Sequence, residues 1–338
     1  MASRFDLVRF AERDFHIMRD DLIDGDFNGN KARKLEYFSN APLHGVKRVV
    51  GWGSSQSNAM ASMSVFAKRR KLEFVYFTNH ISAHLRGSPC GNYALALKNG
   101  MRIYASEDRA KAAHEFAISN LSGGADNSNL NPKTENLARA SWAMPRSAEF
   151  RGGEPRAQER ALLARELSNL IYGENLLIPE GVHTPLAEIG FASQARAIRE
   201  YIAQTGLKFD VFLPSGTGTS AAFLARNLPE CDVYTAPVVG DAAYLGAQIS
   251  ALDSVSRVKI LPPPRKYYFG DLYREFADVY TRLFNETGIE FELIYDPVGW
   301  LTLLSNLKLF KNEIIYIHQG GLGGVASQKE RYKRKNMI

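Results

Sequence analysis

The chain has 338 residues, 45% of them hydrophobic and 23% charged, which is typical of a soluble globular protein with room for two domains. It contains no run of about 18 apolar residues, so we expect no membrane span. Charges interrupt the apolar residues at the N-terminus, which argues against a secretory signal and favours the cytoplasm.

The net charge is +6, and basic residues gather at the C-terminus in KERYKRK. No zinc-finger spacing, aromatic RNA-binding string or basic recognition helix accompanies them, so we expect a solvated helix end and no nucleic-acid partner. Cys90 and Cys231 lie far apart without a second ligand nearby. The sequence therefore predicts neither a disulfide nor a metal site.

Short β-rich runs alternate with longer amphipathic stretches, which predicts an α/β fold with a mostly parallel sheet covered by helices. The expected strands are Arg48–Trp52, Glu73–Thr78, Met101–Ala105, Leu176–Pro179, Asp210–Pro214, Asp232–Val239, Val258–Leu261 and Ile314–His318. The expected helices are Asn58–Arg70, Arg109–Leu121, Leu186–Ala203, Thr219–Leu228, Ala242–Leu252 and Asp271–Glu286. Ser122–Arg160, rich in Gly, Asn, Pro and charge, is expected to be loops and short helices near a domain boundary.

The first chemically informative stretch is the turn Asn28-Gly29-Asn30, which precedes Lys31. Gly and Asn tolerate positive φ, and the following residues begin a helical pattern with Leu35 turned inward. A lysine held in this way and lowered in pKa can form Schiff bases with carbonyl compounds. Taken alone, the stretch is equally compatible with an ordinary surface helix cap.

The next stretch, GWGSSQSNAM, leads from a strand through a polar turn into a helix. Ser57 and Asn58 fall at the first helical turn, where side-chain groups and free backbone N–H groups suit a substrate carboxylate. A plain N-cap is the alternative.

A third stretch, FLPSGTGTSAA, has the composition of a phosphate cradle, with Gly216 and Gly218 set among hydroxyl residues before a helix. It lacks the lysine of a Walker loop. Residues Gly216–Ala221 also match GxGxxA, and Asp241 follows about twenty residues later, as in dinucleotide-binding units. A nicotinamide-dependent oxidoreductase is therefore an alternative function.

The last stretch, IIYIHQGGLGG, ends a strand at His318-Gln319. Ligands bind at the carboxyl ends of parallel strands. We expect His318 to be a packed core residue, whereas Gln319 can reach a ring nitrogen of a bound cofactor.

Six segments in this order, GNKARKLEY, GSSQSN, IPEG, PSGTGTSAA, YDPVGWLTLL and IHQGGLGG, resemble the 1-aminocyclopropane-1-carboxylate (ACC) deaminase/D-cysteine desulfhydrase family of pyridoxal 5'-phosphate (PLP) enzymes. The resemblance implies a tryptophan synthase β-like fold: a large open twisted α/β domain (1–46 and 166–338) with a smaller inserted α/β domain (47–165). It also implies a cytoplasmic homodimer that acts on a small amino acid and releases ammonia and a 2-oxo acid.

By the same resemblance, Lys31 is the Schiff-base lysine and Lys34 contacts the cofactor phosphate. Asn58 holds the ring hydroxyl, and Ser57 with Asn58 binds the substrate carboxylate. The implied phosphate loop is Gly216, Thr217, Gly218, Thr219 and Ser220.

One departure from the family pattern concerns a catalytic tyrosine. Family members carry Tyr directly after a DPV-type turn, followed by a polar residue near the pyridine nitrogen, whereas here Gly299 and Trp300 follow Val298. On this alignment the tyrosine is absent and Trp300 shapes a different pocket. Thr302 or Gln319 remains to partner the ring nitrogen, and a non-catalytic PLP-binding homologue becomes a third alternative.

Overall fold

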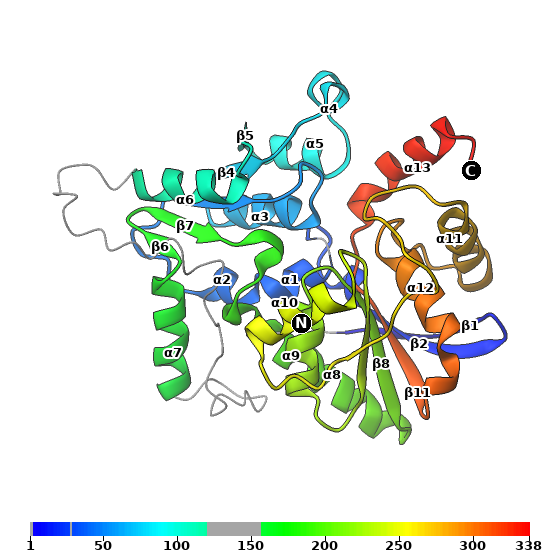
Figure 1. The fold of residues 1–338 in the computed structure, drawn as a ribbon. Helices are drawn as coiled ribbons and strands as arrows, with labels where there is room; N and C mark the ends of the chain where they lie inside the picture. Colours follow the sequence, from blue (N-terminus) through cyan, green and yellow to red (C-terminus); the bar gives the residue numbers. More distant parts are fainter. Residues whose placement is uncertain (1–2, 28, 120–156) are drawn as a thin grey trace.

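The computed structural model describes residues 3–27, 29–119 and 157–338, and these contain two separate β-sheets (Figure 1). One sheet has six strands in the order β1-β2-β11-β8-β9-β10, and the other has five in the order β5-β4-β3-β7-β6. The α/β architecture predicted from the alternating pattern is confirmed. None of the helices in these ranges is long and apolar enough to cross a membrane.

The six-stranded sheet is parallel except for its first strand. Its strands are β1 Phe5–Phe10, β2 Arg13–Arg19, β8 Phe209–Ser215, β9 Val233–Pro237, β10 Lys259–Ile260 and β11 Glu313–His318. β1 and β2 form an antiparallel hairpin, and β2 then pairs in parallel with β11. All residues of β8 are buried, as expected of a central strand covered on both faces.

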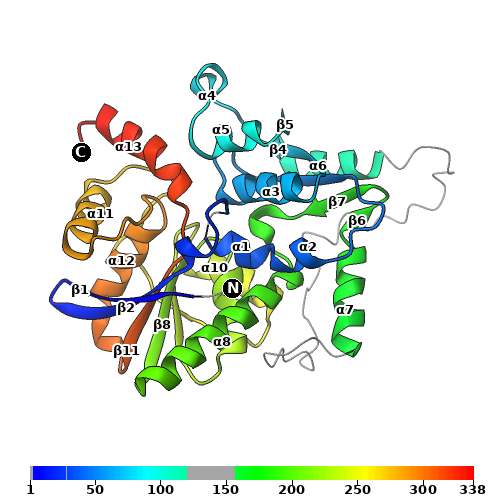
Figure 2. The ribbon, with the colours of Figure 1, turned by 180° about the vertical axis from the view of Figure 1, so that it is seen from behind.

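Helices cover both faces of this sheet (Figures 1 and 2). Ile198 of α8 and Leu224 of α9 share one apolar cluster with β8 and β11, whereas Leu283 of α11 and Leu303 of α12 join the cluster on the opposite face. The helices of this part are α8 Glu188–Thr205, α9 Thr219–Asn227, α10 Ala242–Leu252, α11 Arg274–Thr287, α12 Asp296–Ser305 and α13 Val325–Arg334.

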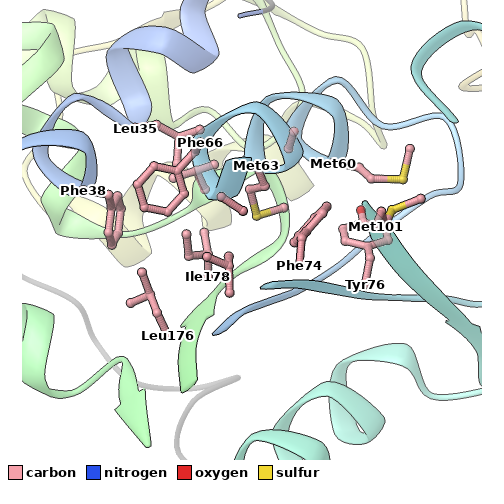
Figure 3. Close-up of a cluster of buried hydrophobic side chains, with 14 of the residues drawn as sticks. Leu35, Phe38, Met60, Met63, Phe66, Phe74, Tyr76, Met101, Leu176 and Ile178 are labelled. Carbon is pink, nitrogen blue, oxygen red and sulfur yellow. The ribbon is translucent and has the colours of Figure 1, made fainter. Parts of the chain in front are cut away.

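The five-stranded sheet is also covered on both sides. Its strands are β3 Arg48–Trp52, β4 Glu73–Thr78, β5 Met101–Ala105, β6 Ile171–Tyr172 and β7 Asn175–Ile178, and its helices are α3 Asn58–Arg69, α4 Ala83–Gly87, α5 Gly91–Lys98, α6 Arg109–Ser119 and α7 Ala157–Ser168. Alternate residues of β4 face opposite ways: Phe74 and Tyr76 pack towards α3 (Figure 3), and Val75 packs towards α6.

The segment that joins the two sheets contains two short helices, α1 Asn30–Lys34 and α2 Glu36–Asn40. On the return, β6 and β7 still belong to the second sheet, because β7 pairs with β3. The expected boundary at residue 165 assigns these strands to the large domain. We therefore propose that the smaller unit ends after β7.

The predicted strands β3, β4 and β5 and the predicted helix α10 have the expected residues, and the other predicted elements are shifted by a few positions. The β1–β2 hairpin and the helices α5 and α12 were not predicted, whereas α13 contains most of the basic segment that was expected to end a helix. Most of the predicted irregular stretch 122–160 lies outside the described residues, and the last four residues of that stretch begin α7. Asn28 also lies outside the described residues.

Candidate active site

A cavity of about 520 Å³ lies where both sheets meet the joining segment. Residues after β3, β8 and β11 contribute to its walls, as expected for the carboxyl ends of parallel strands. The structure brings to this cavity the predicted lysines, carboxylate-binding residues and phosphate loop together with Gln319: Lys31, Lys34, Ser57, Asn58, Gly216, Thr217, Gly218, Thr219, Ser220 and Gln319. Four stretches far apart in the chain thus share one space.

The turn before Lys31 is fixed to the end of β11. Gly29 has φ +49°, and a side chain there would overlap the Gln319 carbonyl, so only glycine fits. Asn30 donates from its backbone N–H to the Gln319 carbonyl (2.9 Å) and from Nδ2 to Gln319 Oε1 (2.7 Å). These bonds anchor the start of α1 and orient Lys31 towards the cavity.

Two buried lysines face the same space. Burial lowers the pKa of Lys31 to about 8, and its Nζ donates to Asn30 Oδ1 (2.9 Å). Burial and the neighbouring charge of Lys31 lower the pKa of Lys34 well below its ordinary value, and its Nζ donates to the Gly181 carbonyl (2.9 Å). Neither amine has a carboxylate partner in the described chain. The pair therefore offers a nucleophilic amine and a binding position for an anion.

The Gly-rich loop lies at the start of α9. Gly218 has φ +70° and caps the helix, which leaves the backbone N–H groups of its first turn directed outward. Thr217 Oγ1 lies 2.9 Å from Thr219 Oγ1, which lies 3.0 Å from His183 Nδ1. Burial and Lys34 lower the pKa of His183 to about 4, so this imidazole is neutral. Hydroxyls, helix start and Lys34 together form a donor set that fits a phosphate group.

The turn before α3 presents two polar side chains. Ser57 caps α3, its Oγ accepting from the N–H groups of Ala59 (3.1 Å) and Met60 (3.4 Å). Asn58 Oδ1 accepts from Asn92 Nδ2 (2.7 Å). A Cβ at Gly321 would lie 2.9 Å from Asn58 Nδ2, so this amide nitrogen points at a glycine of the cavity wall. Ser57 is thus a cap that also faces the cavity.

The position that follows the Asp-Pro-Val turn, where the family carries its tyrosine, does not face the cavity. A Cβ added at Gly299 would lie 2.8 Å from Tyr316 Oη and 3.1 Å from Pro214 Cβ. Position 299 therefore faces the sheet. Trp300 does not shape the pocket either, because it is fully buried and stacks on Tyr316 with ring centroids 4.3 Å apart.

Tyr295, which the sequence analysis missed, lines the cavity instead. Its Oη would lie 3.2 Å from a Cβ at Gly216 in the phosphate loop. The family pattern places a tyrosine and then a polar residue after a turn. Four positions before Gly299 the chain has a similar order, because Tyr295 and Asp296 follow Glu292-Leu293-Ile294. This order could have drawn attention to Tyr295 in the sequence. Because α12 begins at Asp296, Tyr295 precedes the helix and remains free to face the cavity.

Two buried carboxyl groups also line the cavity. Glu292 accepts from the N–H groups of Ile294 (2.8 Å), Asp296 (2.7 Å) and Tyr295. Asp296 Oδ1 accepts from Tyr316 Oη (2.7 Å). Burial raises the pKa of each carboxyl to about 7. Burial thus favours the protonated form of each carboxyl.

The two residues that the sequence offered for the ring nitrogen are otherwise engaged. Thr302 donates to the Val298 carbonyl (2.7 Å) inside α12 and does not line the cavity. Gln319 does line it, but its amide donates to the Pro214 carbonyl (2.6 Å) and accepts from Asn30. His318 is a packed core residue, as predicted, because its Nε2 lies 2.8 Å from the Glu290 carbonyl and its Nδ1 accepts from the Gly320 N–H.

No family model matches the chain. Curated relatives are similar over most of its length. A protein named putative ACC deaminase from Pyrococcus horikoshii is 25% identical over 337 residues, covering 92% of this chain and 85% of its own. A protein of the same name from Pyrococcus furiosus is 22% identical and covers 94% of this chain and 88% of its own.

Solved structures show the same fold. An ACC deaminase homologue superposes with a TM-score of 0.69 at 19% identity, covering all of this chain and 94% of its own. A PLP-dependent aspartate racemase superposes with a TM-score of 0.57 at 10% identity, covering 95% of this chain and 90% of its own. The chain thus has the fold type II architecture of PLP-dependent enzymes. Within that class its similarity is to the putative ACC deaminases, as the sequence resemblance predicted.

Proposed function

We propose that this protein is a PLP-dependent lyase or deaminase that acts on a small amino acid and releases ammonia and a 2-oxo acid. One observation supports this most strongly: the buried amine of Lys31 shares a cavity with the anion cradle formed by Lys34 and the start of α9. PLP needs these two features together, a lysine for its aldehyde and a cradle for its phosphate.

Each part of the cavity has a separate task in this proposal. Bound PLP withdraws electrons from the bonds at the substrate α-carbon. Lys34 and residues 217–220 hold the phosphate, and Asn58 holds the ring hydroxyl. Ser57 and Asn58 bind the substrate carboxylate with hydroxyl, amide and helix N-terminal N–H donors.

Proton movement is assigned to Lys31, Tyr295 and the carboxyl pair. Lys31 Nζ would be the base or acid for the proton on the substrate α-carbon. Tyr295 is a second proton donor over the phosphate-loop side of the cavity. Asp296, which accepts a hydrogen bond from the Glu292 N–H, would be the partner of the ring nitrogen. With a pKa near 7 it is suited to share a proton there.

The finer identity of the substrate rests on similarity. Full-length likeness to proteins named putative ACC deaminase supports ACC, and the resemblance drawn from the sequence adds D-cysteine. A cytoplasmic homodimer is proposed on the same resemblance.

Neither alternative is favoured. For a nicotinamide enzyme Asp241 should reach the ligand, but its carboxylate caps α10 by accepting from the Tyr244 N–H (2.8 Å), and it does not line the cavity. That function also leaves Lys31 without a role. The non-catalytic homologue was suggested by the absence of a tyrosine after Val298, and Tyr295 places another tyrosine in the cavity.

The test is the absorption spectrum of the purified protein with added PLP, before and after borohydride reduction, with peptide mapping. We expect a visible band that reduction abolishes and a phosphopyridoxyl group on Lys31. The Lys31→Ala variant should lack both, and Lys98→Ala, an exposed lysine of α5, should retain them. Absence of the band from the wild-type protein would disprove the proposal. A band without turnover of any amino acid would support the non-catalytic alternative.

A further inference from the structure

The C-terminal basic segment is not wholly solvated, because Arg331 of α13 lines the cavity. Gly324, Ser327, Gln328 and Arg331 all border it, at a spacing of three and four residues that places them on one face of the helix. Arg331 is the one basic residue of the described segment 329–335 that lines the cavity, and two others form ion pairs elsewhere: Lys329 with Glu290 (3.0 Å) and Lys333 with Glu330 (3.6 Å).

Arg331 differs from the other arginine of the cavity in its partners. Arg109 Nη2 lies 3.0 Å from both carboxylate oxygens of Glu180, so its charge is neutralised. Arg331 donates only to neutral oxygens, Gln328 Oε1 (2.9 Å) and the Gly270 carbonyl (2.8 Å). Within the residues that the structure describes, no carboxylate forms an ion pair with Arg331. The cavity therefore carries an unbalanced positive charge on its α13 wall.

The α13 wall of the cavity lies close to the turn that presents Ser57 and Asn58. A Cβ at Gly91 would lie 3.3 Å from Ser327 Oγ and 3.2 Å from Oε1 of Gln56, the residue before Ser57. Ser327 is therefore close to the turn that begins α3. Arg331 lies one helical turn further, about 6 Å along the axis. An amino acid held at Ser57 and Asn58 can direct its side chain towards Arg331.

We propose that Arg331 binds an anionic group at the end of the substrate side chain, so that the preferred substrates are amino acids with a second anion, a carboxylate or a phosphate ester. This inference rests on the proposed function. A guanidinium forms paired hydrogen bonds with either anion, and Arg331 already lies with part of its fork directed by Gln328 and Gly270. The anionic group of the ligand then neutralises the positive charge of Arg331.

Calorimetric titration of the PLP-loaded protein with matched pairs tests this: aspartate against asparagine, and O-phosphoserine against serine, each as D and L forms. We expect the anionic member of a pair to bind at least about tenfold more tightly. Arg331→Gln should reduce that preference by about 10- to 100-fold, as the loss of a charge-assisted hydrogen bond predicts, with neutral ligands unchanged. Arg331→Lys should be intermediate, and Lys333→Gln should match the wild type.

Two results would overturn the inference: equal affinity for both members of each pair in the wild type, or an Arg331→Gln variant that weakens neutral and anionic ligands alike. The second would mean that Arg331 only holds Gly270. Preference for O-phosphoserine alone would support a phosphate ester, and preference for aspartate alone a second carboxylate. Failure of the proposed function is separately visible, because the Lys31 absorption band would then be missing from the same sample.

Discussion

Lys31 is distinguished from the other basic residues by its surroundings and not by its type. The chain has 42 lysines and arginines, and several of them form exposed ion pairs with carboxylates, such as Lys47, Arg102 and Arg265. At Lys31 and Lys34 burial instead lowers the pKa, because desolvation penalises the charged amine. A lysine with a pKa of about 8 has a much larger neutral fraction near physiological pH than an exposed lysine, and the neutral amine is the nucleophile.

Tyr295 gives a residue-scale prediction. Tyr295→Phe removes only the hydroxyl and keeps the ring, which packs on Phe269 with centroids 5.8 Å apart. If Tyr295 transfers a proton, kcat on the best amino acid should fall by about 10²-fold or more, while the PLP absorption band stays unchanged. Steady-state kinetics measures this, with Tyr268→Phe, an exposed tyrosine, as the control. Wild-type kcat in Tyr295→Phe would contradict the role.

At the scale of elements, α1 depends on its neighbours for its position. A helix of five residues is too short to be stable alone. It is held by Arg33, whose fully buried guanidinium donates to Asp20 (Nε–Oδ2 2.7 Å, Nη2–Oδ1 2.6 Å). Gln194 of α8 donates to the same carboxylate (2.8 Å), and Gly190 lets α8 approach the α1 backbone. Lys31 and Lys34 therefore stay in the cavity because α1 is packed tightly against α8.

Gly190→Ala tests this packing. Its Cβ would overlap the backbone carbonyl of Arg33, so we expect a loss of about 1–3 kcal/mol in the free energy of unfolding and weaker PLP binding. Gly246→Ala in α10 is the control, because its Cβ would meet nothing closer than 3.8 Å and should stabilise by about 0.5–1 kcal/mol. Denaturant unfolding and PLP titration measure both effects. Equal stability of the two variants would show that α1 moves freely.

At the scale of the molecule, the cavity belongs to neither sheet alone. The turn before α3 comes from the five-stranded sheet, the phosphate loop from the six-stranded sheet, and Lys31 from the segment between them. A ligand that contacts all three must favour their native arrangement over any in which they separate. Cofactor binding and the stability of the whole fold are thus linked.

PLP should therefore stabilise both parts together. We expect the melting temperature to rise with PLP concentration, in line with about 2.7 kcal/mol at one hundred times Kd. Hydrogen exchange should slow both at residues 53–60 and at residues 215–221. Pyridoxal, which lacks the phosphate, should protect 215–221 less and is the matched control. Protection restricted to one sheet would contradict a cavity shared by both.

The sequence by itself determined the elements whose pattern is local. The strands β3, β4 and β5 were predicted because apolar and β-branched residues alternate or run together between turn residues, and such patterns report burial directly. The Gly- and hydroxyl-rich turns were each predicted as ligand-binding turns because a strand, a turn and a helix in succession place donors at a known edge. That the turns share one ligand was implied by the family resemblance. Lys31, Ser57, Asn58 and Gly216 accordingly line one cavity.

Only the tertiary structure decided the remainder. The pairing of β2 with β11 and of β7 with β3 joins segments more than a hundred residues apart, which no local pattern encodes. Whether Tyr295 or position 299 faces the cavity depends on where α12 begins and on which side of α12 packs against the sheet. Residues four apart lie on the same face only when both belong to one helix, and Tyr295 precedes α12. The sequence contains both positions, and only the packing of α12 against the sheet determines that Tyr295 lines the cavity and Gly299 does not.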